Sequence, residues 1–527
     1  KIGLKIPLFV SYERSNISPQ FNPLDPDVPL AAALQSLESD AERQAYRRLV
    51  EDNTERRSIN FTNVRKIKTN PKAKKHFWDI ENLSATWAMS EETRSNINIQ
   101  NYLIQNQKWS LAYTFQNKMK PWAPFQKSSL FKSPWLALIK DFNINFLPSS
   151  ISVRADLDRS FRRTQLRNSD LTTQGILPTF EKLFTFNRLY NISWNLSRNL
   201  TLTYNATANA LIDEPFGDLD TDEKRDSVLN NIRKLGRMKN FTQTFGVNYK
   251  VPLDKFPLTA WITATANYNA GYNWTAGSLR VVDTLGNLVQ NTRQRSINSN
   301  FNFRSLYRKV KFLKKIDGPA RRTKKPKNYS KLPASRRKRI DSVARAESRL
   351  NVLRAFIRPL LSLRTISVKY SVNEQTQLAG FRPLPRFFGQ DSTFSAPGWD
   401  FVLGGQSPEI KTRAVQNEWL AVGNSLNTPF TQSLNENLSI RALIEPFNGL
   451  KIQLEARKSR TANYQELFRN VGTQDDPVFE SQTPVLQGGY RVSYIALNTS
   501  FVGDNDQNES PVFQTFSNNR TIIRDRL

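Results

Sequence analysis

The chain has 527 residues, a single histidine and no cysteine, and its 76 Lys and Arg against 46 Asp and Glu give a net charge of +30. The lack of cysteine excludes disulfides, thiol nucleophiles and cysteine-based zinc sites, and His76 alone leaves little room for multi-histidine metal sites or histidine-dependent catalysis. Aromatic residues make up 11% of the chain, too many for a disordered protein even at this charge. We therefore expect a folded protein that is not an enzyme, with no catalytic, cofactor-binding or metal-ligating residue.

The first patterned stretch is Pro29–Asp52, inside an insertion at 15–53. Apolar residues recur there among many charges, at Leu30, Leu34, Leu37, Ala41 and Leu49. This pattern predicts a surface helix in a loop. Just before it, Asp25 and Asp27 could be paired catalytic carboxylates, but the prolines beside them favour a rigid turn.

From residue 109 onwards, apolar residues alternate with polar ones. The alternation covers residues 109–116, 142–146, 151–157, 184–196 and 200–208, and Asn, Ser and Thr supply most of the polar positions. A period of two residues is that of a β-strand with one apolar face. Each of these stretches is therefore predicted to be a strand.

An insertion at 212–238 interrupts the strands. Apolar residues within Asp222–Gly236 predict a second helix that ends at Gly236. The acidic residues at its start resemble the opening of a calcium loop, and they are Asp218, Asp220, Asp222 and Glu223. The central Gly and the closing Glu of such a loop are missing, so a plain acidic loop is the better interpretation.

The uncharged tract Pro257–Leu279 is long enough to span a bilayer as a helix. Its polar residues, however, fall at nearly every second position, so a helix would scatter them around its circumference. The tract instead predicts a strand over Leu258–Trp274 whose apolar face contacts lipid and whose Thr/Asn face contacts water. No stretch reads as a membrane helix or as a signal peptide.

The segment Arg308–Arg345, within an insertion at 307–360, holds sixteen Lys or Arg and only two acids. It could be a solvated loop, a contact for an anionic surface or a nucleic-acid site, but it has few aromatics for base stacking, so we expect no nucleic acid. Pro319, Pro326 and Pro333 should keep much of it from forming one helix. Our hypothesis is that it docks an acidic periplasmic partner or the anionic cell-wall layer.

Strand patterns return at 438–444 and 450–457, joined by a tight turn near Asn448 and Gly449. In all there are about fifteen such segments, many of ten or more residues, whereas strands of soluble proteins average about five or six. Long strands with one apolar face are typical of transmembrane β-barrels. We expect an all-β fold in which residues 1–527 are part of one transmembrane antiparallel β-barrel, with long insertions that contain short helices; a large soluble β-sandwich or solenoid is the alternative.

Several motifs resemble the SprA (Sov) family, the outer-membrane translocons of the Bacteroidetes type IX secretion system. They occur in the same order over most of the chain and correspond to the C-terminal part of those much longer proteins: Pro19–Asp27, Ile212–Pro215, Ile366–Ser371, Ala396–Trp399, Ile444–Phe447 and Leu450–Ile452. About fifteen strands cannot close the very wide barrel of that family. The resemblance therefore implies that this chain is one piece of a larger polypeptide.

The resemblance further implies a location in the outer membrane of a Gram-negative bacterium and a link to gliding motility. It implies a conduit that passes folded cargo to the cell surface, where the cargo carries a C-terminal sorting domain. The implied partners are the remainder of the same polypeptide, a PorV-type partner barrel, a periplasmic plug protein and outer-membrane lipid; no cofactor is implied.

Two other functions stay open on the residues alone. One is a different outer-membrane barrel, such as a porin or a nutrient receptor, and the other is a soluble basic binding protein. If the strands are antiparallel, the connections alternate between the two ends of the sheet. The loop at 211–239 should then lie outside the cell and the segment 308–345 on the periplasmic side, so the helix-bearing insertions and the basic segment should be at opposite ends.

Overall fold

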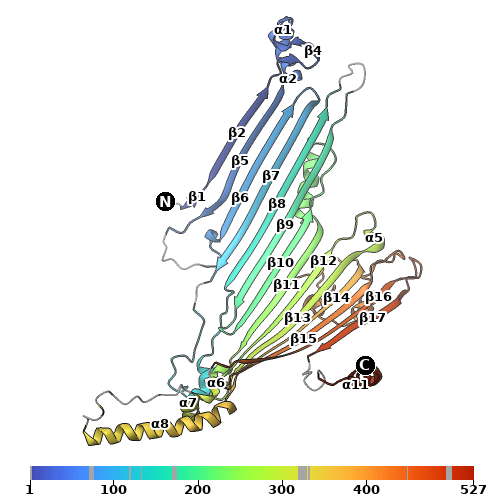
Figure 1. Ribbon diagram of the computed structural model, residues 1–527. Coiled ribbons are helices and arrows are strands. Elements are labelled where there is room, and N and C mark those ends of the chain that lie inside the picture. The colour runs from blue at the N-terminus through green and yellow to red at the C-terminus, as the bar shows by residue number, and fades with distance from the viewer. Residues whose placement is uncertain are drawn as a thin grey trace.

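The computed structural model describes residues 3–69, 76–117, 120–131, 133–168, 175–317, 329, 333–447, 449–493 and 501–526. Its main feature is one antiparallel sheet of fifteen strands (Figure 1). The strands are β1 Leu4–Lys5, β2 Leu8–Ile17, β5 Asp52–Lys66, β6 Leu83–Ser95, β7 Ile99–Gln116, β8 Ser150–Leu166, β9 Thr179–Asn195, β10 Leu200–Leu211, β11 Arg237–Val251, β12 Ile262–Thr275, β13 Asn287–Asn302, β14 Leu363–Phe381, β15 Phe430–Ile444, β16 Ile452–Asn470 and β17 Phe479–Val492.

Every strand from β5 to β17 pairs with its neighbour in the sequence, and both β1 and β2 pair with β5. Most strands are longer than those of soluble sheets; β14 and β16, for example, have 19 residues each. The prediction of an all-β fold of long antiparallel strands is therefore confirmed. Closure of the sheet into a barrel remains outside what the described residues contain, since β17 pairs only with β16.

One predicted strand is shorter than expected and another is absent. The strand predicted at Leu258–Trp274 begins only at Ile262, because the indole Nε1 of Trp261 donates to the carbonyl of Leu258 at 2.8 Å and closes a turn there. The strand predicted at 142–146 is absent: Ile144 makes only an isolated bridge to Trp122 within a long connection, and the segment is too short to pair along its length.

Helices lie in the connections between strands, except the last helix, which follows the last strand. They are α1 Leu30–Gln35, α2 Asp40–Val50, η1 Ile80–Asn82, η2 Pro134–Leu136, α3 Ala137–Lys140, α4 Asp222–Arg233, η3 Leu253–Lys255, α5 Val282–Leu285, α6 Phe303–Tyr307, α7 Lys311–Asp317, α8 Ala334–Leu360, α9 Trp399–Val402, α10 Ile410–Gln416 and α11 Pro511–Arg526. A small hairpin of β3 Phe21–Asn22 and β4 Asp25–Pro29 precedes α1.

The two helices predicted in the first insertions are present. The first is split into α1 and α2, and a capping box between Ser39 and Glu42 fixes the start of α2. The second, α4, ends at Arg233, and Gly236 follows with a φ of +69°, a conformation that glycine adopts without strain. Asp25 and Asp27 lie exposed on β4 of the β3–β4 hairpin, so the turn is at residues 23–24 and precedes them.

The expectation that insertions contain only short helices is wrong for α8, which has 27 residues. Pro333 precedes its first turn and Pro359 lies in its last, and the residues between them are mostly good helix formers. Pro319, Pro326 and Asn448 lie outside the described residues, as does much of the basic segment before Pro333. Among the described helices, α8 included, none is apolar enough over a sufficient length to cross a membrane.

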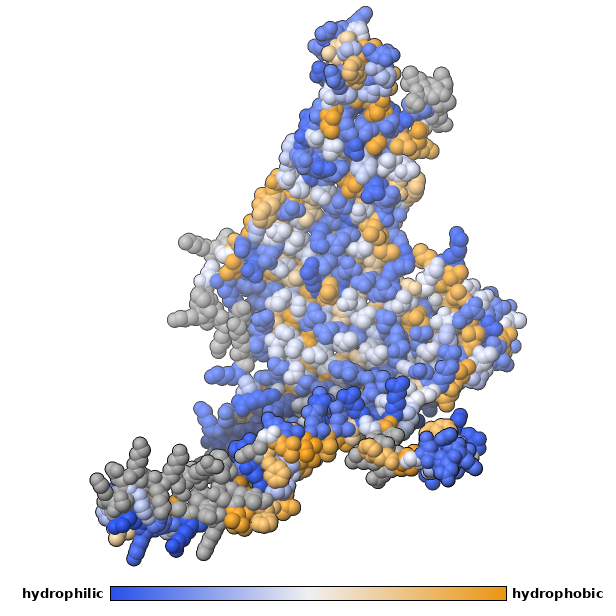
Figure 2. Space-filling view, viewed as in Figure 1, coloured by the Kyte–Doolittle hydropathy of each residue, from blue (hydrophilic) through white to orange (hydrophobic). Residues whose placement is uncertain are grey.

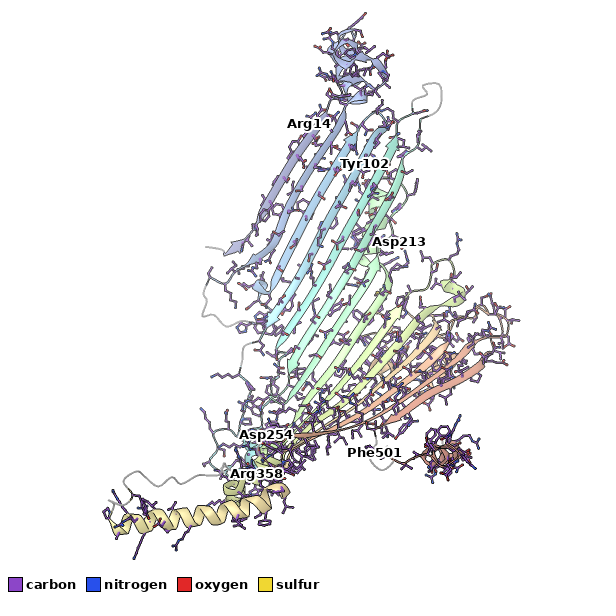
Figure 3. All side chains as sticks on the ribbon, viewed as in Figure 1. Arg14, Tyr102, Asp213, Asp254, Arg358 and Phe501 are labelled. Atoms are coloured by element: carbon purple, nitrogen blue, oxygen red, sulfur yellow. The ribbon has the colours of Figure 1, made fainter. Side chains whose placement is uncertain are left out.

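The connections alternate between two ends of the sheet, which we call the α8 end and the α4 end. In Figure 1, α6, α7 and α8 lie at one end, and α1 and α2 lie at the other. Figure 3 shows Asp254, in the β11–β12 connection, near Arg358 at the α8 end, while Asp213, which begins the connection that holds α4, is at the opposite end of β10. The predicted opposition between the helix-bearing insertions and the basic segment is confirmed for the sheet.

Candidate functional site: the two faces of the sheet

The sheet has an apolar face and a polar face, because the register pairs like positions on neighbouring strands. On the polar face, Thr265 of β12 pairs with Asn298, which pairs with Lys369. One residue along, on the apolar face, Ala266 pairs with Ile297 and Ile297 with Tyr370. The two faces keep these characters across the sheet, and Figure 2 views the side on which hydrophilic residues predominate over the middle strands.

Large apolar side chains are exposed on the apolar face. They are Ile59, Leu83, Leu111, Tyr249, Ile297, Tyr370, Ile440 and Leu454, each between 36% and 55% exposed. We call this set the apolar belt. It has members on β5–β7, β11 and β13–β16, and the same face of β8–β10 carries half-buried apolar residues such as Val153, Ile192 and Leu202. The belt is therefore a feature of the sheet and not a set of scattered surface residues.

The apolar belt crosses the strands obliquely. The residue in register with Leu111 of β7, six strands further on, is Val289 of β13. The belt residue on β13 is Ile297, so over these six strands the belt has shifted by eight residues along the strand direction. With a rise of ~3.4 Å per residue and ~4.8 Å between strands, this drift corresponds to strands tilted by about 45° to the normal of the belt. Strands of transmembrane barrels are tilted by about 35–45°.

Aromatic rings border the apolar belt at the α8 end. The ring of Trp261 lies 6.0 Å from that of Phe301 and 5.0 Å from that of Phe303, measured between ring centroids. On the α4 side of the belt, charged residues appear on the same face: the guanidinium Nε of Arg293 lies 2.8 Å from Glu374, and Arg295 also reaches this carboxylate at 3.0 Å. On the strands themselves, the apolar band thus ends at aromatic rings on one side and at charged residues on the other.

The connection between β14 and β15, residues 382–429, folds back onto the apolar face beyond the belt. We call it the cover segment. It buries Tyr272 and Trp274 of β12 under Phe401, Ile410 and their neighbours in the largest core cluster of the described residues. Gly389 approaches so closely that a Cβ there would meet the ring of Tyr272 at 2.8 Å, which explains the glycine.

Buried polar side chains hold the cover segment to the sheet. Asn291 of β13 and Thr376 of β14 are fully buried, and the amide Nδ2 of Asn291 donates to the carbonyl of Phe401 at 2.9 Å. Gln406 donates to the Asn291 side chain at 2.9 Å, and the Thr376 hydroxyl donates to Gln406 at 2.7 Å. Because these buried groups satisfy one another, the cover segment is a built part of the fold and not a loose loop.

The 212–236 connection covers the neighbouring part of the same face. Val228 of α4 packs with Ile212, Phe184 and Phe186 in a second buried cluster. Glu214 accepts two hydrogen bonds from Arg159 of β8, at 2.6 and 3.0 Å. Arg386 of the cover segment donates to the carbonyl of Lys234 at 3.3 Å, so the two covering connections also touch each other.

Both edges of the sheet are long and carry exposed apolar side chains. On β2, Phe9, Val10 and Tyr12 are more than 60% exposed, and on β17, Leu486 and Tyr490 are also exposed. Within the part of the chain that the structure describes, β2 hydrogen-bonds only to β5 and β17 only to β16. Such edges present a row of unpaired backbone groups ready to accept another strand.

Asp317 anchors the start of the basic segment at the α8 end. Its carboxylate is buried and pairs with Arg364 of β14 and, at 3.2 Å, with Arg304 of α6; Arg364 also lies 3.1 Å from Glu445. Burial opposes ionisation of Asp317, but the hydrogen bonds and charges of the two arginines together outweigh it and lower the pKa of the carboxyl. The helices α6 and α7 are thereby fixed to the sheet.

The acidic residues considered as a calcium loop pair with basic neighbours instead. Asp218 lies 3.1 Å from Arg163, Asp220 2.7 Å from Lys224 and Asp222 3.3 Å from Arg225. The described residues contain no group of three or more His, Asp or Glu side chains arranged to hold a metal ion. His76 is exposed and stacks on Trp78, with 4.9 Å between ring centroids.

The alternation of apolar and polar residues does not reveal the cover segment as a structural unit. Ala396–Trp399 belongs to it, but in the sequence these residues stand out only as a motif that resembles the SprA family. The available signal was the cluster of aromatic residues and glycines between 387 and 405, which is dense for a loop. In comparisons with protein-family models and with curated proteins, nothing matches the chain.

Proposed function

We propose that this chain forms part of the wall of a wide outer-membrane pore, and that the pore is the protein-conducting translocon of a type IX secretion system, the kind of protein that its motifs resemble. In this proposal the apolar belt contacts lipid, the polar face lines the lumen, and the wall conducts folded cargo rather than catalysing a reaction.

The oblique course of the apolar belt is the observation that carries the proposal. A soluble sheet buries its apolar face against another layer, whereas here large apolar side chains such as Leu111 and Ile297 remain exposed along a band. The band makes the angle with the strands that a bilayer imposes on a barrel. The Asn, Ser and Thr residues of the opposite face suit a water-filled lumen.

The open edges favour a pore wider than fifteen strands would enclose. β1 and β2 lie end to end along the same edge of β5, so the fifteen strands span fourteen positions across the sheet. Strands about 4.8 Å apart and tilted by about 45° each occupy ~6.8 Å of circumference, so this sheet would close a barrel of ~30 Å backbone diameter. A folded domain of 100 residues has a radius of gyration of ~13 Å and hence a diameter of ~34 Å, and lining side chains need room as well. Passage of folded cargo therefore requires about twenty strands or more.

Bilayer physics requires that β2 and β17 be paired, because lipid offers no partner for the backbone groups of an edge strand. We propose that strands from the remainder of the same polypeptide occupy these edges, with lateral access to a PorV-type partner barrel and closure by a periplasmic plug protein. A fifteen-strand porin or nutrient receptor, the alternative, would instead pair β17 directly with β2.

Blocking the lumen tests the proposal. The chain has no cysteine, so Gln294→Cys, exposed on the polar face of β13, can be modified in the full-length protein with a polyethylene-glycol maleimide of about 5 kDa. We expect secretion of a folded reporter with a C-terminal sorting domain to stop. Gln416→Cys, exposed at the end of α10 in the cover segment, is the matched control and should leave secretion intact after modification.

Unchanged secretion with Gln294→Cys fully modified would contradict a conduit for folded cargo. If small solutes, but no folded reporter, crossed the unmodified protein, the porin alternative would replace the proposal.

A further inference from the structure

Four exposed aromatic rings gather on the cover segment, and we call them the aromatic cluster: Phe387, Phe388, Phe394 and Trp399. They are between 46% and 58% exposed. The rings of Phe387 and Phe394 and those of Phe394 and Trp399 lie nearly parallel, with 6.4 Å between centroids in both pairs. A surface cluster of this size calls for an apolar environment.

The backbone of the cover segment is bent to present these rings. Phe388 and Phe394 have φ angles of +51° and +58°, in the left-handed region that bulky residues disfavour. The buried hydrogen bonds around Asn291 hold the segment in place and can sustain this cost. Unfavourable backbone conformations that the surrounding structure maintains indicate that the side chains they position, here Phe388 and Phe394, have a function.

The aromatic cluster continues the apolar belt. The ring of Phe388 lies 5.4 Å from that of Tyr204, which belongs to the apolar face of β10 next to the belt. On β12 the Tyr268 hydroxyl donates to the carbonyl of Leu403, so the part of β12 that the cover segment covers begins at Tyr268. Leu403 and Leu384 are also exposed and extend the apolar surface around the cluster.

The strands alone supply too little apolar height. On β12 the apolar face is open from Ile262 to Tyr268, and at ~3.4 Å per residue and a tilt of about 45° this spans roughly 15–17 Å. The apolar band of an outer-membrane barrel is ~25 Å tall. Roughly 8–10 Å is missing at the α4 side, the place where the aromatic cluster lies.

We propose that the aromatic cluster seats in the outer-leaflet interface of the membrane and completes the apolar belt, as a girdle that a folded-back connection supplies in place of the strands. The inference rests on the proposed function, because it takes the belt as the lipid-facing surface. Aromatic rings favour the headgroup level of bilayers, and Trp261, Phe301 and Phe303 border the opposite side of the belt.

The test measures which solvent each position contacts in the full-length protein in lipid vesicles. Single cysteines at Phe394 (aromatic cluster), Ile297 (apolar belt), Gln294 (polar face) and Gln416 (exposed end of α10) carry an environment-sensitive fluorophore. Lipids with a nitroxide at the headgroup or deep in the acyl chain, and aqueous iodide, serve as quenchers.

We expect F394C to be quenched several-fold more by headgroup nitroxide than by iodide, I297C to be quenched by acyl-chain nitroxide, and Q294C and Q416C by iodide alone. If I297C contacts lipid but F394C is quenched only by iodide, the girdle is refuted and the barrel stands. Protection of F394C from all quenchers would mean that a protein partner covers it, which also refutes the girdle. If I297C is quenched by iodide, the proposed function fails and the girdle with it.

Discussion

Ile440 of β15 is the position where a charge should do most damage to membrane insertion. It is 36% exposed in the apolar belt and lies midway between Ile444, at the α8 end of the strand, and Glu436, the first charged residue on the same face. Arginine near the midplane of a barrel's lipid face costs about 2–4 kcal/mol. Since 1.4 kcal/mol is a factor of ten, we expect Ile440→Arg to lower the folding equilibrium constant in lipid by ~30- to 700-fold.

Asn435→Arg is the matched control for this variant. Asn435 is exposed on the polar face of the same strand, between Asn373 and Thr461, and the chain already carries an arginine on that face at Arg441. Guanidinium titrations of the full-length protein in lipid vesicles, followed by tryptophan fluorescence, should give near-native stability for the control. Equal stability of the two variants would refute the assignment of the belt to lipid.

Three further changes test the anchor of α6 and α7, the cover segment and the basic segment. Asp317→Asn removes one of the two carboxylate partners of buried Arg364, so we expect a loss of the order of 2–3 kcal/mol in local stability, read as faster proteolysis of α6 and α7. The pKa of Asp317 is lower in the folded protein than in the unfolded chain, so the stabilisation by its carboxylate is complete at neutral pH. This stabilisation is lost as the pH falls below the ordinary pKa of about 4 and through the lower folded value. In acid, the proteolysis rate of the wild type should therefore approach that of the variant. Gly389→Ala should loosen the cover segment and expose it to trypsin. Gly449→Ala is the control, because Gly449 also has a positive φ but open space around it, and it should not have this effect. Equal effects of the two variants would mean that backbone strain alone is responsible. Replacing residues 336–339 with glutamates should reduce secretion and abolish salt-sensitive recovery of a periplasmic partner; wild-type secretion and recovery would leave the segment a solvated surface.

The strands were predictable because alternation is a local property. Thr265 and Ala266 differ in face whatever pairs with them, so the period of two located most strands and the polarity of each face. The boundaries depended on more than alternation: Leu258 continues the pattern of β12, yet the turn that Trp261 closes excludes it from the strand. Short alternation, as at 142–146, carries too little pairing energy to define a strand.

The cover segment could not be predicted from the same pattern. Trp274 and Tyr272 read as lipid-facing residues because they share a face with Ala266, and only the tertiary contact with Phe401 and Gly389 reveals that protein covers them. That contact joins residues more than 100 positions apart. An apolar residue on a strand identifies a face that avoids water, but it does not identify what covers that face.

Single-particle electron microscopy of the full-length protein in a lipid nanodisc can show directly which strands pair with β2 and β17 and what lies against the apolar belt. We predict a closed barrel of about twenty strands or more in which strands from outside this chain hydrogen-bond to β2 and β17, with Leu111 and Ile297 at the level of the acyl chains. A barrel in which β17 pairs directly with β2, or a sheet whose apolar belt is buried by protein, would contradict the account.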